Sequence, residues 1–437
     1  MELQIVLILA VMAAAYAVAH FRKLSVELSM LAAAVAGGLA GAFIKTPPLG
    51  ELARHLVEGS FTYLDVILVF VTATLFMAVI SESGGVIYAV RGTVRAFVNM
   101  RVIALLVLMI IILIPGALTG AGSVSLLVVG APVAMALSAL GVSGKRTAAI
   151  LFITAGLSAA APPVNIWAMI LSAGTAIPYV GFELPLGIPV LLLGTFTVLT
   201  LGLRKENPVS RETALAAIPE VPAGMTWWRV ILPFLIFFGL VIAARMWPFA
   251  LPIMGLPLQF TIAGLVAWLV SPKRPHLIRL ARTTVKRLLP LLTTMVVVGM
   301  LQQIMTTTGV RGLLSFLVIS TPFVLLIMLL AVVIPVSEGV LTYGGAAVLG
   351  IPLVWFFDSI GLHATMVIAG LSLLWPLGDG LPPTALIGRL SIMVSDYKGT
   401  YGSFLRSTWL PWLVITATGL LMIVYSAKLS FLVRWSM

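Results

Sequence analysis

Two acidic residues lie within long apolar stretches of this 437-residue chain. Glu338 belongs to the segment PVSEGVLTYGG, and Asp379 belongs to the segment PLGDGLPPT. An acid inside an apolar segment is costly to bury, and such acids usually bind a cation, carry a proton or line a water-filled cavity. The pair therefore predicts cation binding or proton coupling. The alternative is a structural role as a cap on a half-helix, or exposure to solvent at a shallow tip.

Adjacent prolines interrupt the apolar sequence twice, at Pro162-Pro163 in SAAAPPVNIWAMIL and at Pro382-Pro383 in PLGDGLPPTALIGR. Proline removes a backbone donor and breaks a helix, and inside a membrane the freed polar groups must find other partners. Exposed carbonyls and half-helix C-termini suit Na⁺, whereas half-helix N-termini suit a carboxylate. One such pair alone would more often be a kink that serves packing, but two at matching positions favour a binding site.

A segment rich in glycine and hydroxyl residues precedes each proline pair: PGALTGAGSVSLLVVGAP and PVSEGVLTYGGAAVLGIP. Glycine permits tight turns, so we expect each segment to form the tip of a re-entrant hairpin that meets the broken helix of its own half. The predicted ligands of a small organic anion are Ser123, Ser125, Asn165, Thr342, Tyr343, Thr384 and Arg389. The predicted Na⁺ ligands are Thr119, Gly122, Ser123, Ala160, Pro162, Asn165, Glu338, Gly339, Gly378 and Asp379. Asn165 could instead cap the helix after the break, and Arg389 could extend to the membrane surface.

The composition indicates which elements must hold these residues. The chain is 61% hydrophobic and only 9% charged, whereas a soluble domain is roughly 25% charged. Apolar runs of about 20 residues, enough to span a bilayer, recur from end to end, so we predict an all-α polytopic membrane protein. The net charge of +12 gathers in short loops, which argues against nucleic-acid binding. The chain has no cysteine, which excludes disulfides and thiol chemistry, and we expect neither an organic cofactor nor enzymatic activity.

The proline pairs belong to an internal repeat. They lie 220 positions apart (382 − 162), and the same shift pairs Pro115 with Pro335. Repeats with interrupted membrane helices at matching positions are typical of transporters. We therefore predict two halves, 1–205 and 225–437, joined by a cytoplasmic linker over 206–224. Each half should hold about five transmembrane helices, one re-entrant hairpin and one Pro-Pro-broken helix, and an odd number of crossings makes the halves inverted repeats.

In the first half, the predicted elements are crossings at about 3–20, 24–43 and 60–82, a hairpin at 101–140, and crossings at 146–177 and 186–203. Two segments mix charged and apolar residues at helical spacing, GELARHLVEG (50–59) and HLIRLARTTVKRLL (276–289). They are predicted to be interfacial helices along the membrane surface, with ordinary solvated loops as the alternative.

Basic residues cluster on one side of this topology. They occur in HFRKLS after the first crossing, at Lys145-Arg146 after the hairpin, and in SPKRPHLIRLARTTVKR of the second half. The positive-inside rule makes that side cytoplasmic. We therefore expect a multi-pass protein of the inner membrane, in contact with membrane lipid, with both termini outside.

The paired hairpin tips and Pro-Pro breaks resemble the ion transporter superfamily of elevator carriers. Within it, GAGSVSLLVVGAP followed by AAAPPVNIWAMIL is most similar to the large membrane subunit of TRAP transporters, of the dicarboxylate and sialic acid type, and the resemblance covers nearly the whole chain. It implies a transport domain from about 101–177 and 322–396 that moves against a scaffold from the first spans of each half. It implies Na⁺-coupled uptake of an organic carboxylate, with a small four-helix membrane subunit and an extracytoplasmic substrate-binding protein as separate partners.

Three alternatives stay open. The first is a stand-alone Na⁺- or H⁺-coupled carboxylate carrier of the same superfamily, and the second is a channel. The third is an intramembrane aspartyl protease, prompted by LGDG around Asp379. That chemistry needs two membrane aspartates, whereas Asp65 and Asp358 are expected near the outer surface, and Pro376 stands where the usual motif has glycine.

Overall fold

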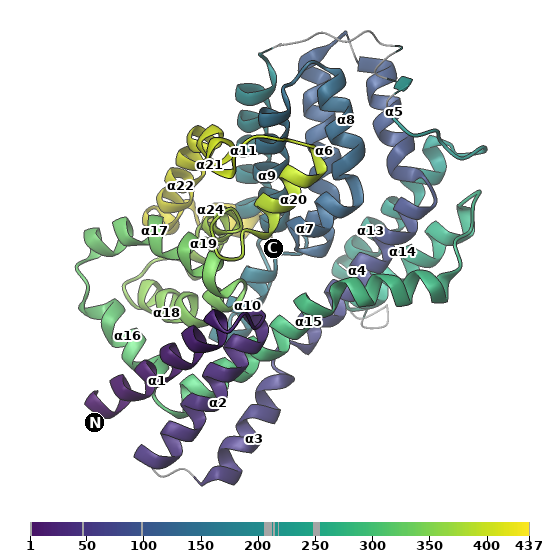
Figure 1. The fold of residues 1–437 in the computed structure, drawn as a ribbon. Coiled ribbons are helices and arrows are strands. Elements are labelled where there is room, and N and C mark those ends of the chain that lie inside the picture. Colours follow the sequence, from purple (N-terminus) through teal and green to yellow (C-terminus); the bar gives the residue numbers. More distant parts are fainter. Residues whose placement is uncertain are drawn as a thin grey trace.

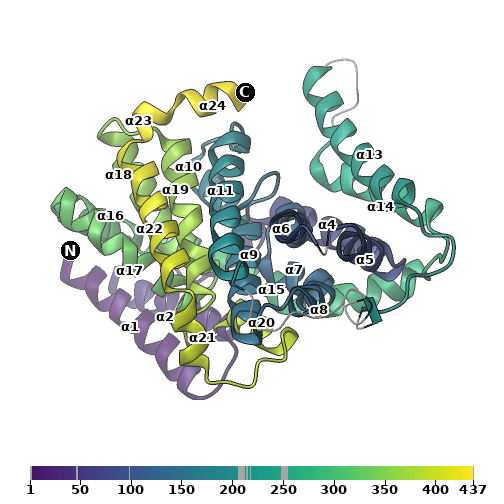
Figure 2. The ribbon, with the colours of Figure 1, turned by 90° about the horizontal axis from the view of Figure 1, so that it is seen from above.

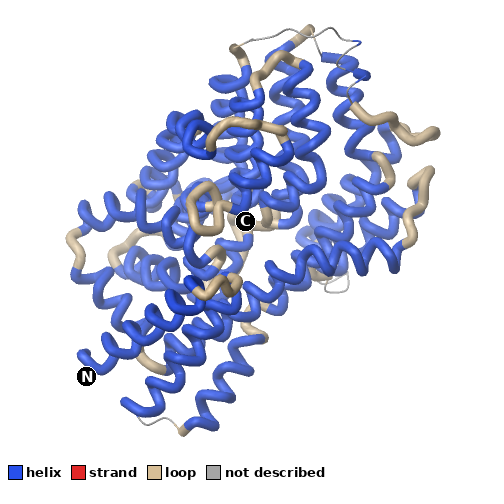
Figure 3. Tube along the Cα trace, viewed as in Figure 1, coloured by secondary structure: helices blue, strands red, loops and turns tan. Residues whose placement is uncertain are grey.

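The computed structural model describes residues 2–45, 48–97, 99–204, 212, 215–216, 218–247 and 254–436. Helices joined by short loops make up this part of the chain, which contains no strand (Figure 3). Nine of its helices are long and apolar enough to cross a membrane, or ten if the bent pair Tyr401–Ser407 and Trp409–Val424 forms one span. The prediction of an all-α polytopic membrane protein is confirmed. About half of the predicted linker over 206–224 lies outside the described residues.

Two sets of helices follow each other along the chain (Figure 1). The first set comprises α1 (Glu2–Phe21), α2 (Val26–Lys45), α3 (Leu49–Ser60), α4 (Leu64–Glu82), α5 (Gly85–Phe97), α6 (Arg101–Thr119), α7 (Gly122–Ser125), η1 (Leu126–Gly130), α8 (Ala131–Ala139), α9 (Gly144–Ala160), α10 (Ile166–Thr175) and α11 (Glu183–Gly202). The second set comprises α13 (Trp227–Met246), α14 (Leu256–Val270), α15 (Leu277–Thr307), α16 (Val310–Ser320), α17 (Phe323–Leu341), η2 (Ala346–Gly350), α18 (Ile351–Ser359), α19 (Ala364–Gly378), α20 (Leu386–Val394), α21 (Tyr401–Ser407), α22 (Trp409–Val424), α23 (Ser426–Leu429) and α24 (Phe431–Ser436). Each set contains a hairpin with a π-helical segment in its second arm, followed by a broken helix.

Two elements differ from the sequence predictions. Helix α5 was not expected; it is amphipathic and buries Val86, Val90 and Val94, which share one face at four-residue spacing. The segment 276–289 is not a separate interfacial helix but the beginning of the 31-residue α15, about 46 Å long at 1.5 Å per residue. Its basic first part and apolar second part are not separated by a turn. In the first half, a turn at 61–63 separates α3, which contains the predicted interfacial segment 50–59, from α4, but the two helices together form one apolar span of 34 residues, Leu49–Glu82.

The two hairpins begin and end at opposite ends of the molecule. The first hairpin ends close to the start of α22, because Lys145 and Trp409 line one cavity. The second hairpin ends close to the other end of α22, where the backbone N–H of His363 donates to the hydroxyl of Ser426 (3.2 Å). The 16 residues of α22 separate these positions by about 24 Å. The bases of the hairpins therefore lie on opposite sides, which is the geometry of inverted repeats.

Helices of the first half pack against helices of the second half on both sides of the molecule. Helix α4 packs against α14, and α15 packs against α2 and α3, so each half completes the other. Phe76 of α4 lies among the rings of Phe237 and Phe260, with ring centroids 6.4 and 6.2 Å away. At the α3–α15 crossing, a Cβ added to Gly299 would lie 2.1 Å from the carbonyl oxygen of Gly59. Figure 2 shows the pairs α1–α2 and α13–α14 on opposite sides of the hairpins and broken helices.

Candidate functional site

The tip of the first hairpin is joined to the first helix break. The backbone N–H of Val164, directly after the proline pair, donates to the carbonyl of Ala117 (3.0 Å). Gly120 ends α6 in the left-handed conformation at φ 72°, which glycine adopts without strain. Gly116 approaches Ser158 so closely that any Cβ there would overlap the serine side chain. The predicted meeting of tip and break is thus built from a hydrogen bond and close packing.

Asn165 holds this break together with both ends of its side chain. Its Oδ1 accepts from the backbone N–H of Ala168 (2.9 Å), which makes it the N-cap of α10. Its Nδ2 donates to the carbonyl of Ala160 (3.0 Å), the last residue of α9. Tyr179 adds a third connection, because its hydroxyl accepts from the backbone N–H of Asn165 (3.0 Å) and donates to the carbonyl of Pro163 (3.1 Å). Asn165 therefore satisfies backbone groups that the proline pair leaves free.

The second tip and the second break meet in a corresponding way. Thr384, the residue that corresponds to Val164 by the 220-position shift, donates from its backbone N–H (3.2 Å) and its hydroxyl (3.0 Å) to the carbonyl of Gly339. A Cβ on Gly378 would lie 2.0 Å from the carbonyl oxygen of Pro335, so the backbones of α17 and α19 touch at the break. The proline peptide bonds at the two breaks, Pro162-Pro163 and Pro382-Pro383, are both cis.

Glu338 and Asp379 are the only acidic residues buried within the described part of the chain, with 1% and 7% exposure. The Glu338 carboxylate accepts a hydrogen bond from Nε1 of Trp167 in α10 of the first half (2.9 Å). The Asp379 carboxylate accepts none from the described residues, and the preceding residue, Gly378, packs directly against Glu338, so the two acids lie near each other. A buried charge without a partner is costly. This acid pair is therefore suited to hold a cation or a proton.

The two tips share one centre. The hydroxyl of Tyr343, directly after the second hairpin's first arm, donates to the carbonyl of Gly120 at the first tip (3.4 Å). The rings of Tyr343 and Trp167 lie 5.2 Å apart. Because Trp167 also donates to Glu338, the first break, the first tip and the second tip form one connected structure.

Some of the predicted hydroxyl ligands already donate a hydrogen bond to a backbone carbonyl, whereas others do not. Thr119 donates to the carbonyl of Pro115 (2.7 Å), Ser125 donates to the carbonyl of Ile112, and Thr342 donates to the carbonyl of Leu341 (2.7 Å). Ser123 is buried at the first tip, and its hydroxyl makes no hydrogen bond to described residues, so it is free to bind a ligand. Gly122 packs against the carbonyl of Ala155.

Arg389 makes no hydrogen bond to either tip in the described ranges. Its side chain is exposed and donates to the carbonyl of Pro383 (2.9 Å), at the outer edge of the second break. The carbonyl of Gly380 in the same break accepts from the hydroxyl of Tyr401 (2.8 Å). Trp167, Tyr179 and Tyr401 therefore belong to the site, although the sequence did not predict them there. The available signal was a polar aromatic residue within about 18 positions after each break, because such residues usually place their N–H or O–H on a buried acceptor.

A cavity of about 470 Å³ lies between the first hairpin on one side and α4 with the start of α15 on the other. Val124 and Leu127 form the hairpin wall, directly beyond Ser123 in the chain. The opposite wall is the first part of α15 with residues of α4. The charged residues of the lining are Lys273, Arg274, Arg279 and Arg287, with Glu82 as the single acid. The cavity is thus a positively charged approach to the first tip.

No group of three or more His, Asp or Glu side chains in the described ranges is arranged so that it could hold a metal ion. A cation at the second tip would therefore need carbonyl or hydroxyl oxygens beside the two carboxylates. Na⁺ accepts such a ligand set, because broken helices commonly bind it through exposed carbonyls. The partnerless carboxylate of Asp379 and the closely approaching backbones at Gly378 fit this type of site.

No protein-family model matches the chain, and no curated protein matches it in sequence. Among solved structures, it is similar to the crystal structure of the YdaH transporter of Alcanivorax borkumensis, which is described as having an unusual topology. The TM-score is 0.56, the match covers 86% of this chain and 88% of that chain, and the sequence identity is 16%. The chain therefore has the fold of a polytopic helical membrane transporter.

Proposed function

We propose that this chain, which has a transporter fold, is a secondary carrier that takes up a small organic carboxylate together with Na⁺. The observation that carries the proposal is the separation of charge around the joined tips. A basic cavity leads to the first tip, whereas the buried acids Glu338 and Asp379 lie at the second tip. An anion and a cation could therefore bind side by side within one centre. Each would reduce the cost of burying the other.

In this proposal the anion approaches along Arg279 and Arg287 and binds near the free hydroxyl of Ser123. A positively charged, partly enclosed cavity raises the local concentration of an anionic substrate. Na⁺ is transported with it and binds at Asp379 and Glu338, with backbone oxygens of the second break completing its coordination. Asp379 has no buried aspartate partner in the described ranges, since Asp65 and Asp358 are exposed, and this argues against the aspartyl protease.

The contacts support an elevator mechanism. Hydrogen bonds join each tip to its break, and Tyr343 joins the two tips, so the hairpins and broken helices are suited to move as one body. The crossed helices α2, α4, α14 and α15 would form the scaffold. Because the cavity opens beside the basic first part of α15, which the positive-inside rule assigns to the cytoplasm, this conformation would be inward-facing.

The finer assignment within this proposal is the large membrane subunit of a TRAP transporter. It would then require a small four-helix membrane subunit and an extracytoplasmic binding protein, both encoded separately. A single comparison distinguishes the stand-alone carboxylate carrier from the TRAP subunit. Uptake by proteoliposomes that contain this chain alone would identify the stand-alone carrier, whereas uptake only after both partners are added would identify the TRAP subunit.

The proposal is tested by uptake of labelled C4-dicarboxylates and sialic acid into proteoliposomes, with gradients of Na⁺, K⁺ or protons imposed one at a time. We expect uptake to follow the Na⁺ gradient. Ser123→Ala should raise the substrate concentration for half-maximal uptake without changing thermal stability, because the hydroxyl supports no other contact. Ser430→Ala is the control, because its exposed hydroxyl bonds only the carbonyl of Ala427, away from the tips. Equal substrate dependence in Ser123→Ala and the parent protein would remove Ser123 from the site.

A further inference from the structure

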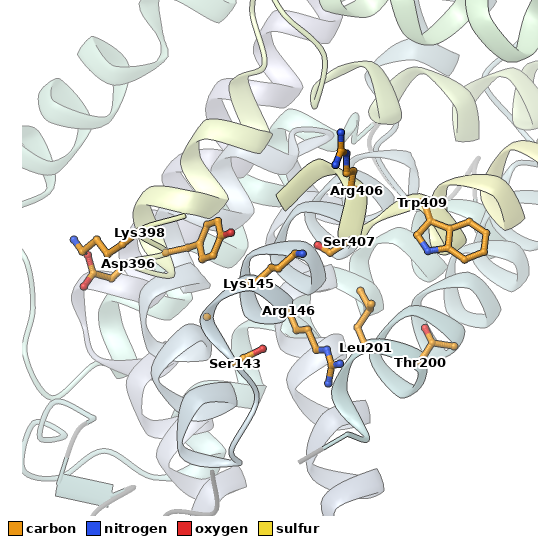
Figure 4. Close-up of a pocket in the computed structure, with 12 residues that line it drawn as sticks. Ser143, Lys145, Arg146, Thr200, Leu201, Asp396, Lys398, Arg406, Ser407 and Trp409 are labelled. Carbon is orange, nitrogen blue, oxygen red and sulfur yellow. The ribbon is translucent and has the colours of Figure 1, made fainter. Parts of the chain in front are cut away.

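A second basic cavity, of about 730 Å³, lies at the far end of α9 from the helix break (Figure 4). It is lined by the start of α9, the end of α11, the loop at 396–398 and the junction of α21 with α22. The 17 residues of α9 place it about 25 Å from the break. It therefore takes no part in the proposed transport site.

The cavity has an excess of positive charge. Its charged lining residues are Lys145, Arg146, Lys398, Arg406 and Asp396. Asp396 forms an ion pair with Lys398, and both side chains are highly exposed. Lys145 and Arg406 have no carboxylate within 4.0 Å among the described residues. Two basic side chains thus face the cavity without a neutralising partner.

The local backbone adds to this positive potential. Lys145 and Arg146 occupy the first turn of α9, where the helix dipole is positive and acidic residues are favoured. That turn contains no acidic residue, and Ser143 makes no side-chain cap to it. The backbone N–H groups and the cations therefore favour an anion at the same place.

The opposite end of the cavity is apolar and open. Figure 4 shows Lys145 in the middle, with Asp396 and Lys398 at one end and Trp409 at the other. Trp409 is 64% exposed, and one turn further along α22, Leu413 is 59% exposed. An exposed tryptophan at the end of a membrane-spanning helix is typical of the interface between headgroups and hydrocarbon. The cavity thus combines a site for a negatively charged headgroup with a surface for acyl chains.

We propose that this cavity binds the phosphate headgroup of an anionic glycerophospholipid, whose acyl chains lie against Trp409 and Leu413. Basic pockets between membrane helices on the cytoplasmic side commonly bind such headgroups. A phosphate that contacts both Lys145 and Arg406 would connect α9 of the first half to α21 of the second half. A soluble phosphate compound would satisfy the same cations, but it would make no use of the apolar surface.

The test measures binding of dibrominated phosphatidylglycerol, which quenches tryptophan fluorescence on contact, to the purified full chain in phosphatidylcholine bicelles. The chain has ten tryptophans and Trp228 is also exposed, so the signal of the cavity is the part of the lipid-dependent quenching that Trp409→Phe removes. The double variant Lys145→Gln, Arg406→Gln should raise the half-saturating lipid fraction about 25-fold. This is about fivefold per removed charge, the equivalent of about 1 kcal/mol for each basic residue near an anionic headgroup. If the double variant does not fold, each single substitution should show the fivefold change.

The control variant is Arg22→Gln, Lys23→Gln. It removes the same charge from exposed positions on the same predicted side, outside the cavity, and should change the half-saturating fraction less than twofold. Dibrominated phosphatidylcholine should bind without saturation in all proteins. Equal losses in the cavity and control variants would show a general charge effect and overturn the proposal. If millimolar inorganic phosphate displaced the lipid and abolished the quenching, the site would be assigned to a soluble phosphate compound instead.

Discussion

Replacing Asp379 by asparagine is the most direct test of cation binding at the second tip. The substitution keeps the size of the side chain and removes one negative charge from a position that is 7% exposed and has no hydrogen-bond partner among the described residues. The packing around Gly378 and the bond from Trp167 to Glu338 are unaffected, so the protein should fold. The expected effect is therefore on the affinity for Na⁺.

Its magnitude follows from Coulomb's law. A carboxylate about 4 Å from Na⁺ contributes roughly 4 kcal/mol at an effective dielectric constant of about 20. The asparagine in the Asp379→Asn variant would regain part of this through its amide oxygen, which also ligates Na⁺. We therefore expect a net loss of about 1–3 kcal/mol, which corresponds to roughly a 5- to 150-fold higher Na⁺ concentration for half-maximal uptake. Glu338→Gln should act in the same direction and keep an oxygen acceptor for Trp167.

The assay is initial-rate uptake into proteoliposomes over a series of external Na⁺ concentrations, with potassium and valinomycin fixing the membrane potential. Asp358→Asn is the matched control, because it removes the same charge from an exposed position at the end of α18. An unchanged Na⁺ dependence in Asp379→Asn, with uptake intact, would refute a cation site at this carboxylate. Uptake that responds to a proton gradient alone and not to Na⁺ would identify the two acids as proton carriers.

Three further predictions concern topology and stability. Single cysteines at positions 143 and 359 should react with membrane-impermeant maleimide from opposite sides, cytoplasmic for Ser143→Cys and external for Ser359→Cys; reaction of both from one side would contradict the inverted repeat. Asn165→Ala should lower the stability by about 1–3 kcal/mol, because the N-cap of α10 is lost and the carbonyl of the last residue of α9 is left unpaired; a melting temperature equal to that of the parent protein would show that the cap is dispensable. Gly299→Ala should cost about 1–3 kcal/mol by forcing α15 away from α3, whereas Gly312→Ala, with open space at its Cβ, should not lower the melting temperature.

The sequence was sufficient to predict the hairpins and the breaks, because each depends on local chemistry. Glycine and proline act on the backbone within a few residues, so the tip near Gly120 and the breaks at the two proline pairs fall where they were expected. The repeat strengthened this prediction, because each feature occurs twice, 220 positions apart, and the two occurrences support each other. The π-helical segments at 126–130 and 346–350 obey the same shift, although their form was not predicted.

The partners of the site residues were not predictable in the same way. The bond from Trp167 to Glu338 joins residues 171 positions apart, and only the assembled fold brings them together. The hydrogen bond from the Ser125 hydroxyl to the carbonyl of Ile112 in α6 likewise depends on how the two arms of the hairpin pack together. The continuity of α15 was missed for another reason. A change from basic to apolar residues marks the depth of a helix in the membrane, not the end of the helix.

The crossing of α4 with α14 and of α15 with α2 has a consequence for biosynthesis. Helix α4 ends at Glu82, and its partner α14 begins at Leu256, so a ribosome that adds ~5–20 residues per second needs roughly 10–35 s to supply that partner. For most of this interval Phe76 has neither Phe237 of α13 nor Phe260 of α14 to pack against and must be accommodated by lipid or by the insertion machinery. The packing of α4 against α14 is thus completed only late in translation, although α4 is among the earliest helices to leave the ribosome.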